Sequence, residues 1–501
     1  PTFWNRNRSS GWNDVSFHGS DQILTPNIDS LAYKGVILQH YYSEAICTPA
    51  RTALLTGKYP MRLGMHGFPL YNSEDRGIPL TERLLPSYLK ELGYATHLVG
   101  KWHVGMSRPE FLPTNRGYDT HYGMRGGFID YYTYNKFRRQ PEHTPHDVAN
   151  TSVSVIENHN SSQPMFLHVT HNAPHAGNEG GHLQPPLYST VKHRHIANSD
   201  RRLYAVAVDA SVGKIVRALA EKKILDDTII IFVSDNGAPT VGDINNWGVN
   251  LPFRGKKFTP WEGSIRVPAF IWHSSIKPRV WNGLMHITDW LPTLTAAAGG
   301  KLIGKIDGVN QWDSIINDGL SKRREVLLAL EDSNRNVYAA YRAGDYKIIV
   351  GNLTGVSNGY YGAEFMLNKG PPPDYYTALK SFILKFSARG CLYNVRRDPT
   401  ESHDIWARAN GIASLLSSRL RALWTLQLKR GPLNLQTEAD PINFNYIWTP
   451  WITENDTEKT EVNIVKEKLI QNNNSTTKAE LVNCNGTTGI TNFLCILRSV
   501  L

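Results

Sequence analysis

Residues 228–238, TIIIFVSDNGA, join an apolar run to a polar end. A short apolar run of this kind is typical of a strand that is buried on both faces of a sheet. Asp235 and Asn236 follow it directly. In open α/β sheets, ligands bind beyond the carboxyl ends of the strands, so these two residues are candidates for a ligand site. Taken singly, an Asp-Asn-Gly triplet is more often a turn.

Three more apolar runs predict strands of the same kind: YATHLVG (residues 94–100), MFLHVTH (165–171) and PAFIWH (268–273). Apolar residues spaced three and four apart predict amphipathic helices over residues 80–93 and 201–224. Strands that alternate with helices indicate an α/β domain with a largely parallel sheet.

Polar residues stand at the ends of these predicted strands. Lys101 and His103 follow the first run, His175 follows the second, and Asp235 and Asn236 follow the opening segment. Because the carboxyl ends of parallel strands meet at one edge, we expect these side chains to converge on one cleft. Carboxylate and amide oxygens suit calcium or magnesium, while cationic side chains suit an anion. Either histidine alone is more often a hydrogen-bonded polar residue than a catalyst. The prediction of a ligand site therefore depends on polar residues standing at the ends of three strands together.

The segment CTPARTALLTG, residues 47–57, predicts a helix that ends at Gly57. Pro49 has the φ angle of a first helical turn, so Cys47 is expected just before that turn. Free N–H groups and the helix dipole favour negative charge there. Arg51 lies one turn further on the same side. The simpler interpretation of such a cysteine is a small buried apolar residue.

The chain has 501 residues, 41% of them hydrophobic, and a formal net charge of +10. This length indicates two or three domains. The charge suits a polyanionic partner such as a sulfated glycan, although a solvated basic surface explains it equally well. We expect no nucleic-acid partner, because long runs of Lys and Arg are absent. No run reaches the roughly 18 apolar residues of a membrane span, so none is expected.

Eight Asn-X-Ser/Thr triplets favour a glycoprotein of the secretory pathway, lysosomal or extracellular; they begin at Asn7, Asn150, Asn160, Asn352, Asn455, Asn473, Asn474 and Asn485. The chain starts at Pro1, so either a leader was removed or the sequence is incomplete at its start. Cys484 and Cys495 are close enough in sequence to form a disulfide in a tail loop. Cys47 and Cys391 are far apart, and each is a candidate free thiol.

The pattern changes near residue 330. Residues 336–352 predict a β-hairpin with Gly344 and Asp345 at its turn, and residues 412–430 predict a helix. We therefore expect three parts: an α/β domain over residues 1–328, a smaller α+β domain over 329–450, and an Asn/Thr-rich tail over 451–501.

In these segments the chain resembles the type I sulfatases, and among them the arylsulfatase B-like (N-acetylgalactosamine-4-sulfatase-like) group. The resemblance covers about residues 11–450 and rests on an ordered series of motifs: CTPARTALLTGKYPMRLGMHG, LVGKWHVGM, LPTNRGYDTHYG, THNAPH, SDNGA, NNWGVNLPFRGKKFTPWEGSIRVP and CLYNVRRDPTESHDI. It implies an alkaline-phosphatase-like catalytic domain, with a mostly parallel sheet flanked by helices, and a smaller C-terminal domain.

The resemblance also implies that a formylglycine-generating enzyme oxidises Cys47 to formylglycine during synthesis. The aldehyde hydrates to a geminal diol, and one hydroxyl attacks the sulfur of a sulfate ester. The other hydroxyl then loses its proton, which expels sulfate and regenerates the aldehyde. A plain cysteine or serine lacks the second hydroxyl and would stay blocked by the covalent adduct.

Cationic residues receive their implied roles from the same motifs. Arg51 would hold and polarise the diol. Lys101 and Lys257 would bind the sulfate oxygens, and Lys256 is the less favoured lysine of the RGKKF segment. Fixed cations of this kind stabilise the charge that grows on the leaving oxygen.

The resemblance assigns the proton transfers and the metal to five further positions. His103 would act as a base when the intermediate breaks down, and His175 would bind sulfate and protonate the leaving oxygen. Asp235 and Asn236 would bind calcium together with the oxygen of the modified Cys47. Such a metal lowers the cost of bringing an oxyanion nucleophile to an anionic substrate.

The first ten residues, PTFWNRNRSS, depart from the family pattern. Family members usually begin with a central apolar strand that ends in two adjacent aspartates, both of them calcium ligands, so this strand is expected to be missing or replaced here. Arg8 and Ser9 stand about where the aspartates belong, and Asp14 is part of the following segment. Three oxygen donors fall short of the roughly six to eight that calcium prefers, and an arginine would repel the cation.

Two explanations of this departure predict different functions. If the start is a truncated or mis-joined version of a working sulfatase, which we favour because the other site residues are intact, the protein hydrolyses sulfate esters. Its substrates would be glycans such as 4-sulfated N-acetylgalactosamine, or aryl sulfates. Otherwise it is a metal-impaired homologue that binds sulfated ligands without turnover. A phosphatase or phosphodiesterase of this fold would have Ser or Thr at position 47 and more Asp and His metal ligands.

Overall fold

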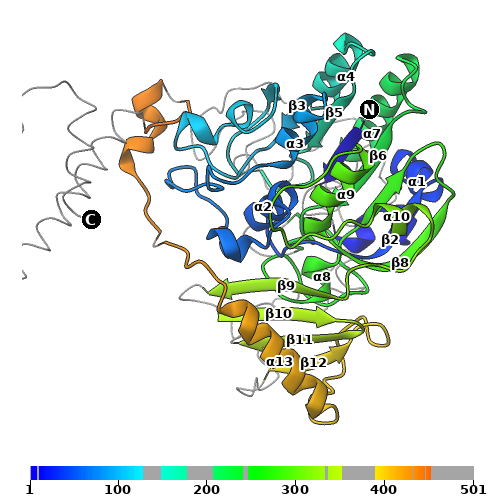
Figure 1. Cartoon of the computed structure of the whole chain (residues 1–501), viewed down its shortest axis with the longest axis vertical. Coiled ribbons are helices and arrows are strands. Elements are labelled where there is room, and N and C mark those ends of the chain that lie inside the picture. The colour runs from blue at the N-terminus through cyan, green and yellow to red at the C-terminus, as the bar shows by residue number, and fades with distance from the viewer. Residues whose placement is uncertain are drawn as a thin grey trace, which may run out of the picture. The chain divides into compact units, whose positions relative to one another are not determined.

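The computed structural model describes residues 2–7, 11–127, 148–177, 207–240, 246–332, 337–351, 390–431, 433–445 and 447–452. The chain divides into two compact units, Pro1–Trp451 and Ile452–Leu501, and the first contains two β-sheets (Figure 1). Cys484, Cys495 and nearly all of the predicted tail lie outside the described residues. The predicted domain boundary near residue 328 stays a prediction. Among the described residues, no helix has the length and apolar character needed to cross a membrane.

The larger sheet has eight strands in the order β4-β3-β5-β1-β6-β7-β2-β8. Its strands are β1 (Thr2–Asn7), β2 (Val36–Tyr42), β3 (Ala95–Gly100), β4 (Thr120–Tyr122), β5 (Met165–Thr170), β6 (Ile229–Ser234), β7 (Ala269–Trp272) and β8 (Arg279–His286). Neighbouring strands are parallel except where β7 pairs with β6 and β2. The four predicted strands are confirmed as β3, β5, β6 and β7, and the mostly parallel sheet is confirmed with them.

Side chains of the central strand β6 alternate between the two faces of this sheet. Ile231 and Val233 pack into the core on one face, and Ile230 and Phe232 pack into the core on the other. Each of the four is at most 1% exposed. A strand covered on both faces has no solvent side to make polar, which explains its continuous apolar run.

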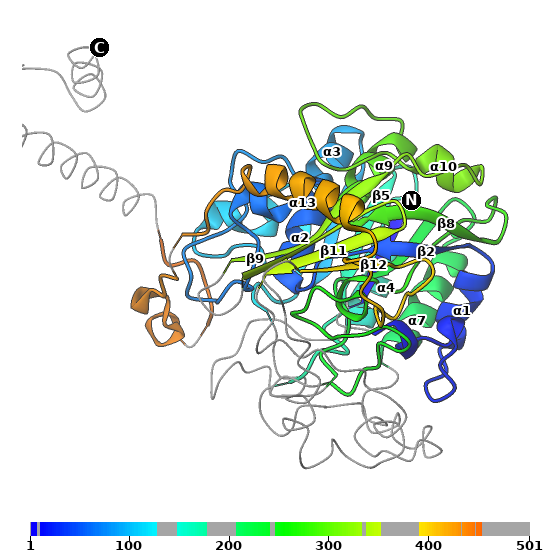
Figure 2. The same ribbon diagram turned by 90° about the horizontal axis from the view of Figure 1, so that it is seen from below.

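Helices cover both faces of the sheet (Figures 1 and 2). The helices on one face are α1 (Pro26–Tyr33), α4 (Val148–Asn158) and α7 (Ala207–Glu221), and those on the other are α2 (Cys47–Thr56), α3 (Leu85–Glu91), α9 (Trp290–Ala297) and α10 (Trp312–Ile316). The predicted helix over residues 80–93 is shorter in the structure, because Pro86 is accommodated only in the first turn of α3. Within the predicted range 201–224, the described helix is α7.

Strand β1 lies in the centre of the larger sheet. It pairs in parallel with β5 on one side and with β6 on the other, and Asn7 is in register with Ser234. The place of the expected apolar strand is therefore filled by Thr2–Asn7. The sequence pattern did not predict a strand over these six residues, because they are not an apolar run. Arg8 and Ser9 lie outside the described residues.

The smaller sheet is antiparallel throughout, in the order β12-β11-β10-β9. Its strands are β9 (Glu325–Asp332), β10 (Val337–Ala343), β11 (Tyr346–Gly351) and β12 (Cys391–Asn394). The predicted hairpin is confirmed, since Ala343 pairs with Tyr346 across the turn that contains Gly344. The predicted C-terminal helix is α13 (Asn410–Trp424), which packs on β10 and β11 (Figure 2).

A buried charge cluster joins the smaller sheet to helix α8 (Glu262–Ile265). On β11, Nζ of Lys347 lies 3.0 Å from Oε1 of Glu262 and 2.7 Å from Oε1 of Glu401, and all three side chains are 0% exposed. The backbone N–H of Glu262 also donates to Oε2 of Glu401 at 2.7 Å. Charges removed from water in this way are tolerated only when they are paired. The cluster therefore fixes α8 and the loop that precedes it.

We expect Lys347→Met to lower the free energy of unfolding by about 3–5 kcal/mol, because it leaves two buried carboxylates without their ammonium partner. The matched control is Lys322→Met. Lys322 forms an exposed ion pair with Asp313 at 3.4 Å, and loss of such a pair costs about 1 kcal/mol or less. Chemical denaturation followed by circular dichroism measures both changes. Equal losses in the two variants would contradict the assigned role of the cluster.

Candidate active site

The carboxyl ends of β3, β5 and β6 bring five of the predicted site residues to one edge of the sheet. Lys101 and His103 follow β3, His175 follows β5, and Asp235 and Asn236 follow β6. Lys101, Asp235 and Asn236 are 0% exposed, and the two histidines are at most 8% exposed. The structure thus brings these five residues together in a buried polar region; the cleft that the strand-end pattern predicted stays a prediction.

Helix α2 brings Cys47 and Arg51 to the same region. It begins at Cys47, one residue after the extended Ile46, and ends at Gly57, whose φ of 65° is left-handed. Cys47 is therefore the first residue of the helix and not, as expected, the residue just before its first turn. Every residue of α2 is buried. Its N-terminal N–H groups and dipole favour an anion beside Cys47.

Arg51 connects α2 to the ends of two strands. Its Nη1 donates to the backbone carbonyl of Lys101 at 2.7 Å. Its Nη2 lies 3.7 Å from Oδ2 of Asp235, and both side chains are at most 2% exposed. The guanidinium therefore sets the position of α2 against the ends of β3 and β6.

The surroundings of the Cys47 sulfur are electropositive. Burial acts to raise the pKa of the Cys47 thiol, and so does Asp235. Lys101, Lys257 and Arg51 outweigh both, so the pKa is lowered. These three cations come from segments that are far apart in the sequence. Their positive charge favours an anionic group at the position of the Cys47 sulfur.

His103 lies beside the N-terminal turn of α2. Its Nε2 is 2.8 Å from the carbonyl oxygen of Leu70, so Nε2 carries a proton that it donates to this oxygen. The hydroxyl of Thr48 donates to the carbonyl of His103 at 3.1 Å. His103 has a φ of 60°, and a Cβ on Gly127 would lie 2.9 Å from its ring. A residue with no side chain at position 127 leaves room for this imidazole.

His175 and Lys257 contact each other. Nζ of Lys257 lies 3.5 Å from Nε2 of His175, while Nδ1 of His175 lies 2.9 Å from the carbonyl oxygen of Ala176. Because that carbonyl only accepts, Nδ1 carries a proton and Nε2 faces the ammonium group. Lys257 is 2% exposed, whereas Lys256 is half-buried. Of the two lysines, Lys257 is the one that reaches His175.

The loop that carries Lys257 is tied to the strand-end region by its backbone. The N–H of Lys257 donates to the carbonyl of Ala238 at 3.0 Å, and the N–H of Phe258 donates to the carbonyl of Ala45 at 3.1 Å. Ala238 comes just after the Asp-Asn-Gly segment, and Ala45 comes just before α2. These two bonds bring the lysine to the nucleophile position, although more than 200 residues separate the two in sequence.

Asp235 and Asn236 offer a carboxylate and an amide oxygen, the donor types that calcium binds. Both are fully buried, and Nδ2 of Asn236 donates to the carbonyl of Gly237 at 2.8 Å, which leaves its oxygen side as the acceptor. Their chemistry fits a hard cation. Among the described residues, however, no three His, Cys, Asp or Glu side chains are grouped closely enough to hold a metal. The pair alone provides fewer donors than calcium prefers.

Asp14, which the sequence analysis placed in the segment after the expected metal ligands, binds backbone groups. Its carboxylate accepts from the backbone N–H of Gly11 at 2.6 Å and from that of Val249 at 2.8 Å. These bonds join the segment after β1 to the loop before Phe253. The carboxylate is thereby engaged by backbone groups.

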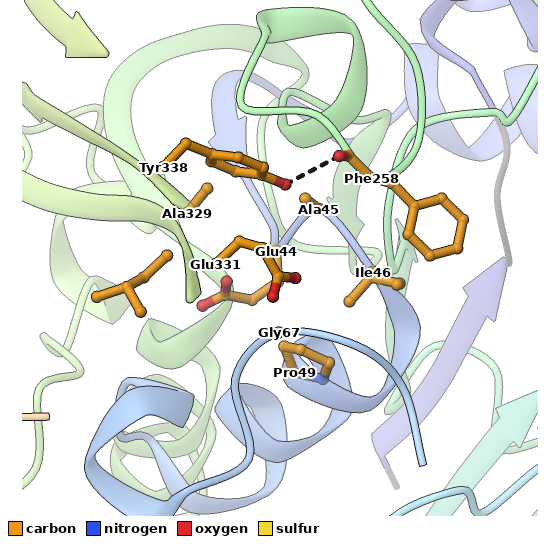
Figure 3. A pocket seen from close by; sticks show the side chains of 10 residues that line it. Glu44, Ala45, Ile46, Pro49, Gly67, Phe258, Ala329, Glu331 and Tyr338 are labelled. Atoms are coloured by element: carbon orange, nitrogen blue, oxygen red, sulfur yellow. Dashed lines mark hydrogen bonds between the residues drawn. The ribbon is translucent and has the colours of Figure 1, made fainter. Parts of the chain in front are cut away.

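The sequence patterns did not predict a small pocket whose lining includes residues 44–46. Figure 3 shows the carboxyl groups of Glu44 and Glu331 directed toward the same space, beneath the hydroxyl of Tyr338. The cavity has a volume of about 20 Å³, and Tyr338 donates to the carbonyl of Phe258 at 2.8 Å. Burial raises the pKa of Glu44 to about 8. Its position three residues before Cys47 was the available signal.

Comparisons with known proteins show the family of this chain. The family model described as Sulfatase matches residues 9–300. Arylsulfatase J of Mus musculus is 32% identical over 493 residues, which cover 90% of this chain and 80% of that relative. Arylsulfatase A of Homo sapiens is 28% identical and the alignment covers 86% and 87% of the two chains. The human N-acetylgalactosamine-6-sulfatase is 31% identical over 62% of this chain and 65% of its own.

Solved structures agree on the fold. The crystal structure of Ps i-CgsB superposes with a TM-score of 0.72 at 25% identity and covers 89% of this chain and 96% of its own. The PsFucS1 sulfatase from Pseudoalteromonas sp. gives a TM-score of 0.66 at 24% identity, covering 86% and 91%. With the predicted alkaline-phosphatase-like architecture and most of its length matched, this chain belongs to the sulfatase family.

Proposed function

We propose that this sulfatase hydrolyses sulfate esters with a formylglycine made from Cys47 and with a calcium ion. Its substrates would be sulfated glycans, such as those ending in 4-sulfated N-acetylgalactosamine, or aryl sulfates. One observation carries the proposal: the folded chain buries Arg51, Lys101 and Lys257 in the region around the buried Cys47. Their positive charge lowers the pKa of the Cys47 thiol. A buried site with this excess of positive charge suits an anionic ester and the negative charge that grows during its cleavage.

The modified residue 47 would supply a hydrated aldehyde, whose hydroxyl is the nucleophile toward sulfur. Arg51, held by the Lys101 carbonyl and by Asp235, would orient that group. Lys101 and Lys257 would hold the sulfate oxygens and stabilise their charge. The substrate would then be fixed with its sulfur beside the N-terminus of α2, where the helix dipole also favours the anion.

The two histidines would move protons at different atoms. His175 has its Nε2 beside Lys257. An anionic sulfate bound next to it would favour the imidazolium, protonated at both nitrogens, and Nε2 would deliver this second proton to the leaving oxygen. His103 has its Nε2 fixed by the Leu70 carbonyl, which leaves Nδ1 as the basic nitrogen for the modified residue. Asp235 and Asn236 would hold calcium, which lowers the cost of bringing two negative groups together.

The proposal also includes the location of the protein in the cell and its sulfatase subtype. The eight Asn-X-Ser/Thr triplets support a glycoprotein of the secretory pathway, lysosomal or extracellular, where the formylglycine-generating enzyme would act on the chain. A 4-sulfatase specificity of the arylsulfatase B type rests on the motifs alone. The other function considered, binding of sulfated ligands without turnover, is less well supported because the residues proposed for catalysis, Cys47, His103 and His175, are present together with the cationic residues. Binding alone gives little physical reason to keep all of them.

Peptide mapping by mass spectrometry tests the modification. In protein secreted from animal cells, the peptide that contains Cys47 is expected to be lighter by about 18 Da, the difference between cysteine and formylglycine. The peptide with Cys391, a second buried free cysteine, is the internal control and should keep its mass. An unmodified Cys47 in protein that hydrolyses no sulfate ester would support the binding function instead.

Replacement of adjacent lysines tests the anion site. Lys257→Ala removes a charge-assisted contact to sulfate, so we expect kcat/KM for an aryl sulfate to fall by roughly ten- to a hundredfold. Lys256→Ala is the matched control and is expected to stay within about twofold, because its side chain is half-buried outside the contact with His175. If Lys256→Ala caused the larger loss, the assignment of the sulfate ligand would be wrong.

Calcium titration tests the metal pair by a measurement that needs no turnover. Asp235→Asn keeps the shape of the side chain and removes its charge, so calorimetric calcium affinity is expected to fall by about tenfold or more. Asp318→Asn, at a side chain that is 66% exposed, is the control and should bind calcium like the wild type. Equal affinities for all three proteins would exclude Asp235 as a ligand.

A further inference from the structure

Three residues from separate segments form a closed ring of hydrogen bonds beside the start of α2. The hydroxyl of Thr48 donates to the carbonyl of His103 at 3.1 Å, and it accepts from the backbone N–H of Leu70 at 3.1 Å. The carbonyl of Leu70 in turn accepts from Nε2 of His103 at 2.8 Å. Thr48 is 0% exposed, and the other two residues are at most 7% exposed. Because a buried polar group that loses its partner is costly, these bonds hold the three segments in one arrangement.

Thr48 differs from the other threonines of α2 in the groups that its hydroxyl binds. Thr52 and Thr56 donate to helix carbonyls four residues earlier, at 2.9 Å and 2.7 Å. This is the usual bond of a threonine inside a helix. Thr48 is the second residue of α2, so the carbonyl four residues before it precedes the helix. Its hydroxyl instead binds two segments outside α2.

The backbone of His103 is held at both of its polar groups. Its N–H donates to the carbonyl of Arg125 at 2.9 Å, and its carbonyl accepts from Thr48. Its φ of 60° lies in the left-handed region, which is uncommon for a residue with a side chain. Such a conformation persists only where the surrounding structure holds it. The bond from Thr48 is therefore one of the two that keep the imidazole on its side of the site.

Leu70 sets the orientation of the imidazole through its carbonyl. Its side chain packs in the core, and its N–H is held by Thr48. The next N–H, of Tyr71, donates to Oε2 of Glu74 at 3.2 Å. The flanking rings of Phe68 and Tyr71 stack on each other but are 42% and 43% exposed, so their packing constrains the backbone little. The direction of the Leu70 carbonyl thus depends on the backbone bonds around it.

We infer that Thr48 is a positioning residue for His103. The inference rests on the proposed function, in which Nδ1 of His103 takes a proton when the intermediate breaks down. The ring is then positively charged, and the Leu70 carbonyl on Nε2 stabilises it, because hydrogen bonds from charged donors are stronger. Thr48 acts through the backbone: it holds the carbonyl of His103 and the N–H of Leu70, so the imidazole keeps one orientation before the proton arrives.

A residue that orients only this base has a distinct effect on the kinetics. The ratio kcat/KM depends on the steps up to cleavage of the ester, whereas kcat also includes the later breakdown of the intermediate. Slower breakdown alone therefore lowers kcat and KM together and leaves kcat/KM unchanged. A general distortion of the site lowers kcat/KM as well, because binding and cleavage are then impaired too.

The test compares variants at position 48 on 4-nitrocatechol sulfate, with rates expressed per modified residue 47 as measured by peptide mapping. Thr48→Val keeps the shape and removes the hydroxyl, so kcat is expected to fall about tenfold, the loss of one hydrogen bond, with kcat/KM within about twofold of the wild type. Thr48→Ala should give the same pattern, and it replaces Thr48→Val if valine prevents folding. Thr48→Ser keeps the hydroxyl and should restore kcat to within about threefold.

Thr52→Val is the matched control. Thr52 is 0% exposed on the same helix, and its hydroxyl binds only a carbonyl of α2, so kcat should stay within about twofold of the wild type. Equal losses of kcat and kcat/KM in Thr48→Val, or no loss in either, would overturn the positioning role while the proposed function stands.

Hydrogen exchange followed by mass spectrometry measures the ring without turnover. The amide of Leu70 is expected to exchange about tenfold faster in Thr48→Val, and at the wild-type rate in Thr48→Ser and Thr52→Val. Unchanged exchange in Thr48→Val would also overturn the inference, because the ring would then not depend on the hydroxyl. If the wild type hydrolyses no sulfate ester, the proposed function fails and the positioning role fails with it, while faster exchange in Thr48→Val would still support the ring itself.

Discussion

A guanidinium that is almost fully buried must satisfy its charge and its five donors inside the protein. Two of the contacts of Arg51 lie at the ends of strands: its Nη1 donates to the carbonyl of Lys101, and its Nη2 lies 3.7 Å from the carboxylate of Asp235. These contacts hold the N-terminus of α2 over the carboxyl edge of the larger sheet. If α2 were displaced, Cys47 would leave the field of the cations, and Asp235 would lose the positive charge that faces it. The geometry of the site therefore depends on this one side chain.

The smaller sheet supports the site without contributing a proposed catalytic residue. Its buried Lys347 forms ion pairs with both Glu262 and Glu401, and this fixes helix α8. The loop before α8 carries Lys257, and its backbone bonds to Ala238 and Ala45 complete the positioning. Rigid support of this kind matters for a site that stabilises charge, because cations are effective only when they are already oriented before the charge develops. The second sheet is thus part of the mechanism through packing.

Much of the fold was predictable because its strands have a simple pattern. A strand with both faces covered has to be apolar throughout, so β3, β5, β6 and β7 were recognised as continuous runs. The antiparallel direction of β7 could not be predicted from its apolar run, because the connecting chain and not the composition sets the direction of a strand. β1 was missed for the opposite reason. TFWNRN is not an apolar run, and its central place is seen only in its backbone pairing with β5 and β6.

The sequence by itself determined which chemical groups are present and where each stands relative to a strand or helix end. Cys47 at a helix start, Lys101 and His103 after β3, and Asp235 and Asn236 after β6 follow from local patterns. Only the tertiary structure decided which of them meet. The approach of Lys257 to His175, the bond between Leu70 and His103, and the exposed stacking of Phe68 on Tyr71 depend on loops. Loops have no periodic pattern, so their course is fixed by backbone hydrogen bonds and burial that form only when the chain is folded.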